Sequence, residues 1–115
     1  MQWVEDRLRE LADKDGQYRE FNAQVVATAD PATMLGVRVP KLRRLAREVS
    51  RSGDRDAFLG ELPHRWYEEY LVHAFALNET REVEPAVRLL DALLPFVDNW
   101  CVCDALNPRA FHDEK

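Results

Sequence analysis

The stretch that decides the fold is PKLRRLAREVS, residues 40–50. Its apolar residues Leu42, Leu45, Ala46 and Val49 recur at the three- and four-residue spacing that places side chains on one face of a helix. Pro40 suits the first helical position, because its fixed φ matches the helix and its missing amide hydrogen is not needed there. We therefore expect a helix over residues 40–50 with one buried face.

Similar amphipathic segments lie on both sides of this helix. We expect helices over residues 3–13, 17–27 and 82–94 and a short helix over 56–60. A further helix should begin after Leu62-Pro63, and the last helix should run from Asp98 to the residue before Pro108. Asp98 is read as the N-cap of the last helix. Residues 36–39 are read as an extended connector. The apolar faces should comprise Tyr18, Phe21, Val25 and Val26 in the second helix, and Val83, Ala86, Val87, Leu90 and Leu94 in helix 82–94.

Short helices with short connectors and paired apolar faces indicate an all-α fold. We expect antiparallel helix pairs of the HEAT type, stacked as a short α-solenoid (an α-α superhelix) in one domain over residues 1–115. No clean repeat of 40–47 residues is visible, so a small helical bundle is the alternative. We expect Glu68 and Glu69 to cap their helix or to pair with Arg65, and His73 to be a packing residue with its hydrogen bonds satisfied.

Composition limits the class of protein. The chain has 115 residues, 46% of them hydrophobic, and a net charge of −5, which is ordinary for a globular domain. It has no run of 18 apolar residues and no signal-peptide pattern at its N-terminus. The two cysteines, Cys101 and Cys103, are too close in sequence for an unstrained disulfide. We therefore predict a soluble protein of the reducing cytoplasm, without a membrane partner.

Positive charge is concentrated in one segment. Between residues 38 and 51 the charge is +5, and the remainder of the chain carries −10. The six basic residues of this strip are Arg38, Lys41, Arg43, Arg44, Arg47 and Arg51, against the single acid Glu48. Such a strip can bind a phosphate backbone, although a solvated helix face is the plainer explanation.

The last helix carries an unusual pair of side chains. Val102, Ala105 and Leu106 form its expected core face, whereas Trp100 and Asp104 lie one turn apart on the opposite surface. An indole attracts positive charge through its ring face. A carboxylate can stabilise an oxocarbenium ion or orient a water molecule. Alternatively, Trp100 packs beneath a neighbouring helix and Asp104 pairs with an arginine.

Three segments together resemble the DNA alkylation repair family of AlkD-like glycosylases. They are MLGVRVPKLR (residues 34–43), YEEYL (67–71) and VDNWCVCD (97–104), and their order and separations also match the family. The Asp-Asn-Trp-x-x-x-Asp element is the specific one. The resemblance covers the N-terminal half of a typical member, so we expect the chain to be the N-terminal part of a longer protein.

The resemblance implies a solenoid with a concave, basic surface for duplex DNA that contains alkylated purines. It implies hydrolysis of the N-glycosidic bond of N3- or N7-alkylated purines, with no metal or organic cofactor. Trp100 would pack on the deoxyribose of the lesion, and Asp104 would stabilise the oxocarbenium ion and position water. DNA contacts are expected from Arg38, Lys41, Arg43, Arg44 and Arg47.

Two other expectations concern binding. Cys101 and Cys103 point about 200° apart on a helix, so with His112 they do not form a metal site. An uncovered C-terminal helix face should lead to self-association.

The alternative to an enzyme is a non-catalytic HEAT-type scaffold that binds DNA or a protein partner, and the fold alone does not separate the two.

Overall fold

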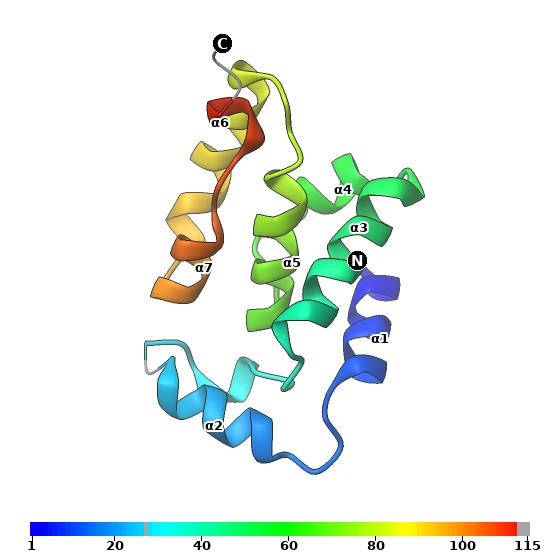
Figure 1. The fold of residues 1–115 in the computed structure, drawn as a ribbon, viewed down its shortest axis with the longest axis vertical. Coiled ribbons are helices and arrows are strands. Elements are labelled where there is room, and N and C mark those ends of the chain that lie inside the picture. Colours follow the sequence, from blue (N-terminus) through cyan, green and yellow to red (C-terminus); the bar gives the residue numbers. More distant parts are fainter. Residues whose placement is uncertain (27, 113–115) are drawn as a thin grey trace.

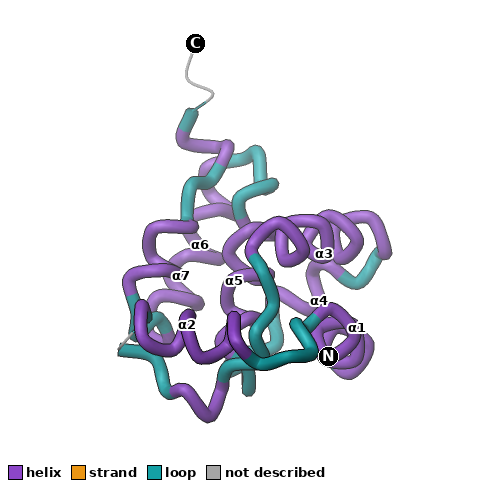
Figure 2. The backbone as a smooth tube through the Cα atoms, turned by 60° about the horizontal axis from the view of Figure 1, so that its bottom comes forward, coloured by secondary structure: helices purple, strands orange, loops and turns teal. Residues whose placement is uncertain are grey.

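The computed structural model describes residues 1–26 and 28–112, and these form helices and loops only (Figure 2). The α-helices are α1 (Gln2–Leu11), α2 (Gln17–Val25), α3 (Val39–Ser52), α4 (Arg55–Leu59), α5 (Tyr67–Leu77), α6 (Val83–Leu93) and α7 (Trp100–Ala105). Short 3-10 turns cover Pro31–Thr33, Leu94–Phe96 and Arg109–Phe111. The predicted all-α fold is confirmed.

Helix α5 is the centre of the molecule. It packs against α1, α3 and α4 on one side and against α6 and α7 on the other (Figure 1). Helix α2 crosses one end of this arrangement (Figure 1). The molecule measures 45 × 28 × 25 Å, the elongated shape of helices stacked side by side, as in a short α-solenoid. No helix in the described ranges is long and apolar enough to cross a membrane.

Helix α3 has the amphipathic structure that its sequence predicts. Leu42, Leu45, Ala46 and Val49 are all buried, and they pack chiefly against α5. The helix ends at Gly53, which adopts the left-handed conformation (φ +88°) that glycine tolerates without steric cost. The basic side chains consequently lie on the outer surface of α3.

The predicted inner face of α2 is wrong in part. Phe21 is 63% exposed and Val25 is 44% exposed, whereas Val26 is buried at the end of the helix. The reason is that α2 lies across the end of the helix stack, where no residue of the helix itself is buried. The predicted helix end at Ala27 lies outside the described residues.

The predicted inner face of α6 is also wrong in part. Ala86 and Leu93 are fully buried, but Val83, Val87 and Leu94 are 55%, 41% and 47% exposed. The helix therefore packs on α5 and on the Arg109–Phe111 turn through one edge of its apolar surface. Val83 and Val87 of α6 and Leu94 directly after it form an exposed apolar stripe, the α6 stripe.

Two carboxylates are buried at the start of α5. Glu69 is the predicted cap, since its Oε1 accepts hydrogen bonds from the backbone amides of Arg65 and Trp66 at 3.1 and 2.8 Å. The expectation that Glu68 caps α5 or pairs with Arg65 is wrong. The Glu68 carboxylate instead accepts hydrogen bonds from the amides of Leu35, Gly36 and Val37 at 2.8 to 3.4 Å. Glu68 thus fixes the connector that leads into α3.

The buried histidine of α5 also differs from the expectation. His73 has no exposed surface, and its Nδ1 lies 2.8 Å from Nε2 of His64. Its Nε2 has no hydrogen-bond partner among the described residues. Burial lowers the pKa of His73 to about 4, and burial together with the neighbouring His73 lowers the pKa of His64 to about 3. Both rings are therefore neutral at physiological pH.

Candidate active site

The candidate site is built on α7, a helix of six residues whose first turn is capped by Asn99. The Oδ1 atom of Asn99 accepts a hydrogen bond from the backbone amide of Val102 at 3.0 Å. The predicted N-cap, Asp98, is therefore wrong by one residue. Asp98 lies outside the helix, where its Oδ1 accepts a hydrogen bond from the Asn99 side-chain amide at 2.9 Å. Asp98 thus orients the residue that caps α7.

Val102 and three hydrogen bonds of Asn78, the residue after α5, hold α7 and the segment that follows it in place. Val102 is fully buried in the core. The Asn78 side chain donates to the carbonyl of Ala105 at 2.8 Å and accepts from the amide of Asn107 at 2.7 Å. The Asn78 carbonyl accepts from the amide of Arg109 at 2.9 Å. A helix of this length is not stable alone in water, so these contacts set its position.

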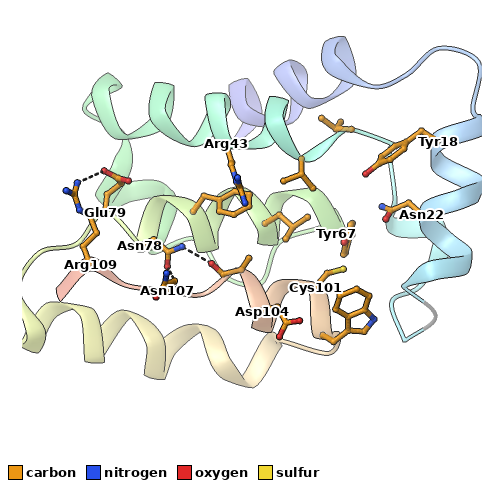
Figure 3. A pocket seen from close by; sticks show the side chains of 16 residues that line it. Tyr18, Asn22, Arg43, Tyr67, Asn78, Glu79, Cys101, Asp104, Asn107 and Arg109 are labelled. Carbon is orange, nitrogen blue, oxygen red and sulfur yellow. Dashed lines mark hydrogen bonds and ion pairs between the residues drawn. The ribbon is translucent and has the colours of Figure 1, made fainter. Parts of the chain in front are cut away.

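The outer face of α7 carries Trp100 and Asp104. Trp100 is 50% exposed, and Asp104 is also exposed one turn further along. Both line a cleft of about 550 Å³ between α2, α3, α5 and α7 (Figure 3). The alternative in which Trp100 packs beneath another helix is not what the structure shows, and no described ion pair involves Asp104.

Arg43 provides a positive charge on the opposite wall of the cleft. Its guanidinium carbon lies 5.2 Å from the ring centre of Phe75, and the side chain extends from α3 into the cleft (Figure 3). An aromatic ring beneath a guanidinium limits its motion and contributes a cation–π attraction. The cleft therefore combines a carboxylate and an exposed indole on one wall with a fixed cation on the other. Such a set of groups can hold an anionic backbone beside a cationic centre.

The floor of the cleft includes Tyr67 and Cys101. Burial raises the pKa of the Tyr67 phenol well above its usual value, and the neighbouring Cys101 thiol raises it further. Tyr67 therefore remains a neutral phenol. Cys101 is half-buried and Cys103 is exposed, and both thiols are free. No group of three metal-binding side chains occurs within the described part of the chain.

The other predicted DNA-binding residues lie in two different places. Arg38 pairs with Asp13 at 2.9 Å and stacks over Tyr18 at 4.6 Å, and Lys41 donates to the carbonyl of Leu11 at 3.3 Å. These two cations are engaged with the N-terminal segment. Arg44 and Arg47 line a separate groove beside the N-terminal end of α1. Of the five predicted basic contacts, only Arg43 lines the cleft together with Trp100 and Asp104.

Sequence reasoning missed several residues of the site. Tyr18 and Asn22 reach the cleft from α2, and Asn78 reaches it from the end of α5 (Figure 3). Glu68 was named but given the wrong role, since it positions the connector before α3. The segment YEEYL could have indicated a buried role for Glu68, because a carboxylate within a strongly apolar helix is unusual unless it has buried partners.

Among the comparisons with known proteins, one gave a match. A search of curated proteins and a search of solved structures each gave no significant match. The family model described as DNA alkylation repair enzyme matches residues 4–113. That range contains the connector, the start of α5 and the whole of α7, which are the three segments with the family resemblance. The chain therefore belongs to the DNA alkylation repair enzyme family, and its role is in DNA alkylation repair.

Proposed function

We propose that this protein hydrolyses the N-glycosidic bond of N3- or N7-alkylated purines in duplex DNA. The observation that carries the proposal is the joint exposure of Trp100 and Asp104 in the cleft that Arg43 also lines. Alkylation at N3 or N7 places a positive charge on the base, which makes the base a good leaving group. The protein then needs to stabilise the sugar cation and supply water.

Each residue has a distinct task in this reaction. Asp104 supplies the negative charge that stabilises the developing oxocarbenium ion, and it orients the attacking water. Trp100 packs on the deoxyribose and attracts the cationic centre through its ring face. Arg43 holds the backbone phosphate on the other side of the cleft. Arg38, Lys41, Arg44 and Arg47 add positive charge along the bound DNA.

The proposal is tested by measuring release of 7-methylguanine from methylated duplex DNA. We expect Asp104→Asn to slow release by about 100-fold or more, because it removes the charge that stabilises the transition state. The matched control is Asp91→Asn, which changes an exposed carboxylate of α6 that has no ion pair within the described residues. Control and parent should release base at the same rate.

Equal release by Asp104→Asn and by the parent would remove Asp104 from the mechanism. If the parent binds DNA but releases no base, the alternative is favoured, a non-catalytic HEAT-type scaffold on the same fold.

We also propose that the chain associates with a second copy through the exposed apolar stripe of α6, since Val83, Val87 and Leu94 all lie on its surface.

A further inference from the structure

A carboxylate lies at the opposite end of the active-site cleft from Cys101 (Figure 3). It belongs to Glu79, two residues beyond the end of α5, and it lines the cleft together with Arg109 of the Arg109–Phe111 turn. The Nη1 atom of Arg109 lies 3.6 Å from Oε1 of Glu79, and the two side chains are 52% and 49% exposed. Neither residue has a task in the proposed reaction. The cleft therefore ends in a solvent-accessible ion pair that the reaction does not use.

The backbone on both sides of this ion pair is held by other contacts. The amide of Arg109 donates to the carbonyl of Asn78 at 2.9 Å, and the amide of Ala110 donates to the carbonyl of Thr80 at 3.1 Å. Ala110 is also buried. The two segments are thus joined without help from the charged groups. Removal of either charge should leave them in place, because an exposed ion pair adds little to stability.

Glu79 also lies close to the cations of α3. A small cavity of about 140 Å³ is lined by Asn78 and Glu79 from the end of α5 and by Arg43 and Arg47 from α3. No ion pair within the described ranges involves Arg43 or Arg47, so Arg109 is the one described partner of Glu79. This end of the cleft thus holds one carboxylate among three guanidinium groups. The guanidinium groups attract an anionic ligand, and the carboxylate weakens that attraction.

We propose that Glu79 limits the affinity of the cleft for DNA, because its carboxylate occupies Arg109 in place of a phosphate. The separation of 3.6 Å is longer than a hydrogen bond, so a phosphate oxygen that forms hydrogen bonds to the guanidinium can displace the carboxylate. A duplex that enters this end of the cleft must first break the ion pair, and its affinity is lower by that cost. Undamaged DNA is released more readily as a result, which matters because undamaged sites far outnumber lesions. This inference rests on the proposed function for its ligand.

The test compares two substitutions that change the net charge equally. Glu79→Gln removes the competing carboxylate, and Glu82→Gln removes an exposed carboxylate nearby in the chain that lines neither cavity. Binding of an unmodified duplex is measured by fluorescence anisotropy over a range of salt concentrations. We expect Glu79→Gln to bind about three- to fivefold more tightly than Glu82→Gln at low salt. Its log–log salt slope should be steeper by up to about 1, because Arg109 then contacts a phosphate without losing another partner.

A second comparison separates competition for Arg109 from simple charge repulsion. In an Arg109→Gln background, Glu79→Gln should raise the affinity by a smaller factor, because the cation for which carboxylate and phosphate compete is absent. An equal gain in both backgrounds would overturn the inference, as would equal affinities of Glu79→Gln and Glu82→Gln. Glu79→Ala must show the same gain as Glu79→Gln. Helical circular dichroism checks that each variant is folded.

Unmodified DNA separates this inference from the proposed function. Tighter binding by Glu79→Gln supports the competing role of Glu79 even if no base is released from methylated DNA. Normal base release together with equal binding by Glu79→Gln and Glu82→Gln overturns that role and leaves the proposed function intact. Absence of measurable binding by both the parent and Glu79→Gln would overturn the inference as well.

Discussion

At the scale of single residues, the buried Glu68 carboxylate holds a segment of backbone in place through hydrogen bonds. It is fully buried and accepts hydrogen bonds from three consecutive amides of the connector before α3. Gly36 belongs to the same turn, where φ is +88° and an added Cβ would lie 2.9 Å from Cβ of Arg19. The connector therefore depends on both a glycine and a remote carboxylate.

We expect Glu68→Gln to lower the free energy of unfolding by about 1–3 kcal/mol, because a neutral amide leaves some of these buried donors unsatisfied. The measurement is urea denaturation at pH 7. Glu82→Gln, which changes an exposed glutamate next to α6, serves as control and should lie within about 0.5 kcal/mol of the parent. A loss no larger than that of the control would mean that Glu68 does not stabilise the connector.

Helical periodicity places Trp100 and Asp104 opposite Val102, but it left open whether Trp100 is exposed or packs beneath a neighbouring helix, and the structure shows it exposed. The sequence did not predict the partner of Glu68, since those amides lie more than 30 residues away in the chain. The N-cap of α7 was predicted one residue early, because Asp98 and Asn99 are both good capping residues. Only the backbone geometry selects Asn99.

At the scale of elements, the buried histidines join α4, α5 and the segment between them. His64 stacks on Phe58 of α4 at 4.8 Å, and its Nδ1 lies 3.7 Å from Glu69 of α5. Both histidines have folded-state pKa values below the unfolded value of about 6.5. The unfolded chain therefore binds protons first as the pH falls, and it is favoured by acid.

We predict that stability is constant between about pH 7 and about pH 9 and decreases below about pH 6.5. Each histidine contributes about 1.4 kcal/mol per pH unit until its folded pKa is reached. Burial raises the pKa of Glu69, which acts in the opposite sense, but Glu69 is present in all the compared proteins and its contribution cancels in the comparison. Urea denaturation at pH 7 and pH 5 should show a smaller difference for His73→Leu than for the parent or for the exposed control His112→Gln. Identical differences in all three proteins would contradict the prediction.

Most helix ends lie within about two residues of the predicted ones, but some buried faces were predicted wrongly. For α3 the polar and apolar arcs are sharply separated, so the buried face could be predicted. For α6 the apolar residues extend over a wider arc, and periodicity does not say which part meets α5. The structure places Ala86 and Leu93 there and leaves Val87 exposed.

At the scale of the whole molecule, the exposed stripe of α6 is an apolar surface outside the candidate active site. Val83, Val87 and Leu94 lie on one side of the helix, and Phe96 beyond it is 39% exposed. Contiguous apolar surface of this kind favours association. We expect the chain to form dimers or larger species, with a mass above 13.4 kDa that increases with concentration.

Light scattering over a range of concentrations tests this expectation. Val87→Lys should shift the protein toward monomer, because a buried ammonium group is costly at an apolar contact. Ala92→Lys introduces the same charge at an exposed position of α6 outside the stripe and should associate like the parent. A parent that stays monomeric at high concentration would contradict self-association.

The single-domain organisation and the cytoplasmic location stay predictions from the sequence.

The attachment of α7 through Asn78 has a consequence for chemical ageing. Asparagine is thermolabile, and conversion of its side chain to aspartate replaces the donor amide by an acceptor oxygen. At Asn78 that oxygen would face the carbonyl of Ala105, so an attraction at 2.8 Å would become a repulsion. Helix α7 would lose one of its attachments, while the burial of Val102 and the bond from Arg109 to the Asn78 carbonyl remained. We therefore expect storage to disturb the position of α7, and with it Trp100 and Asp104, while the helix content stays unchanged.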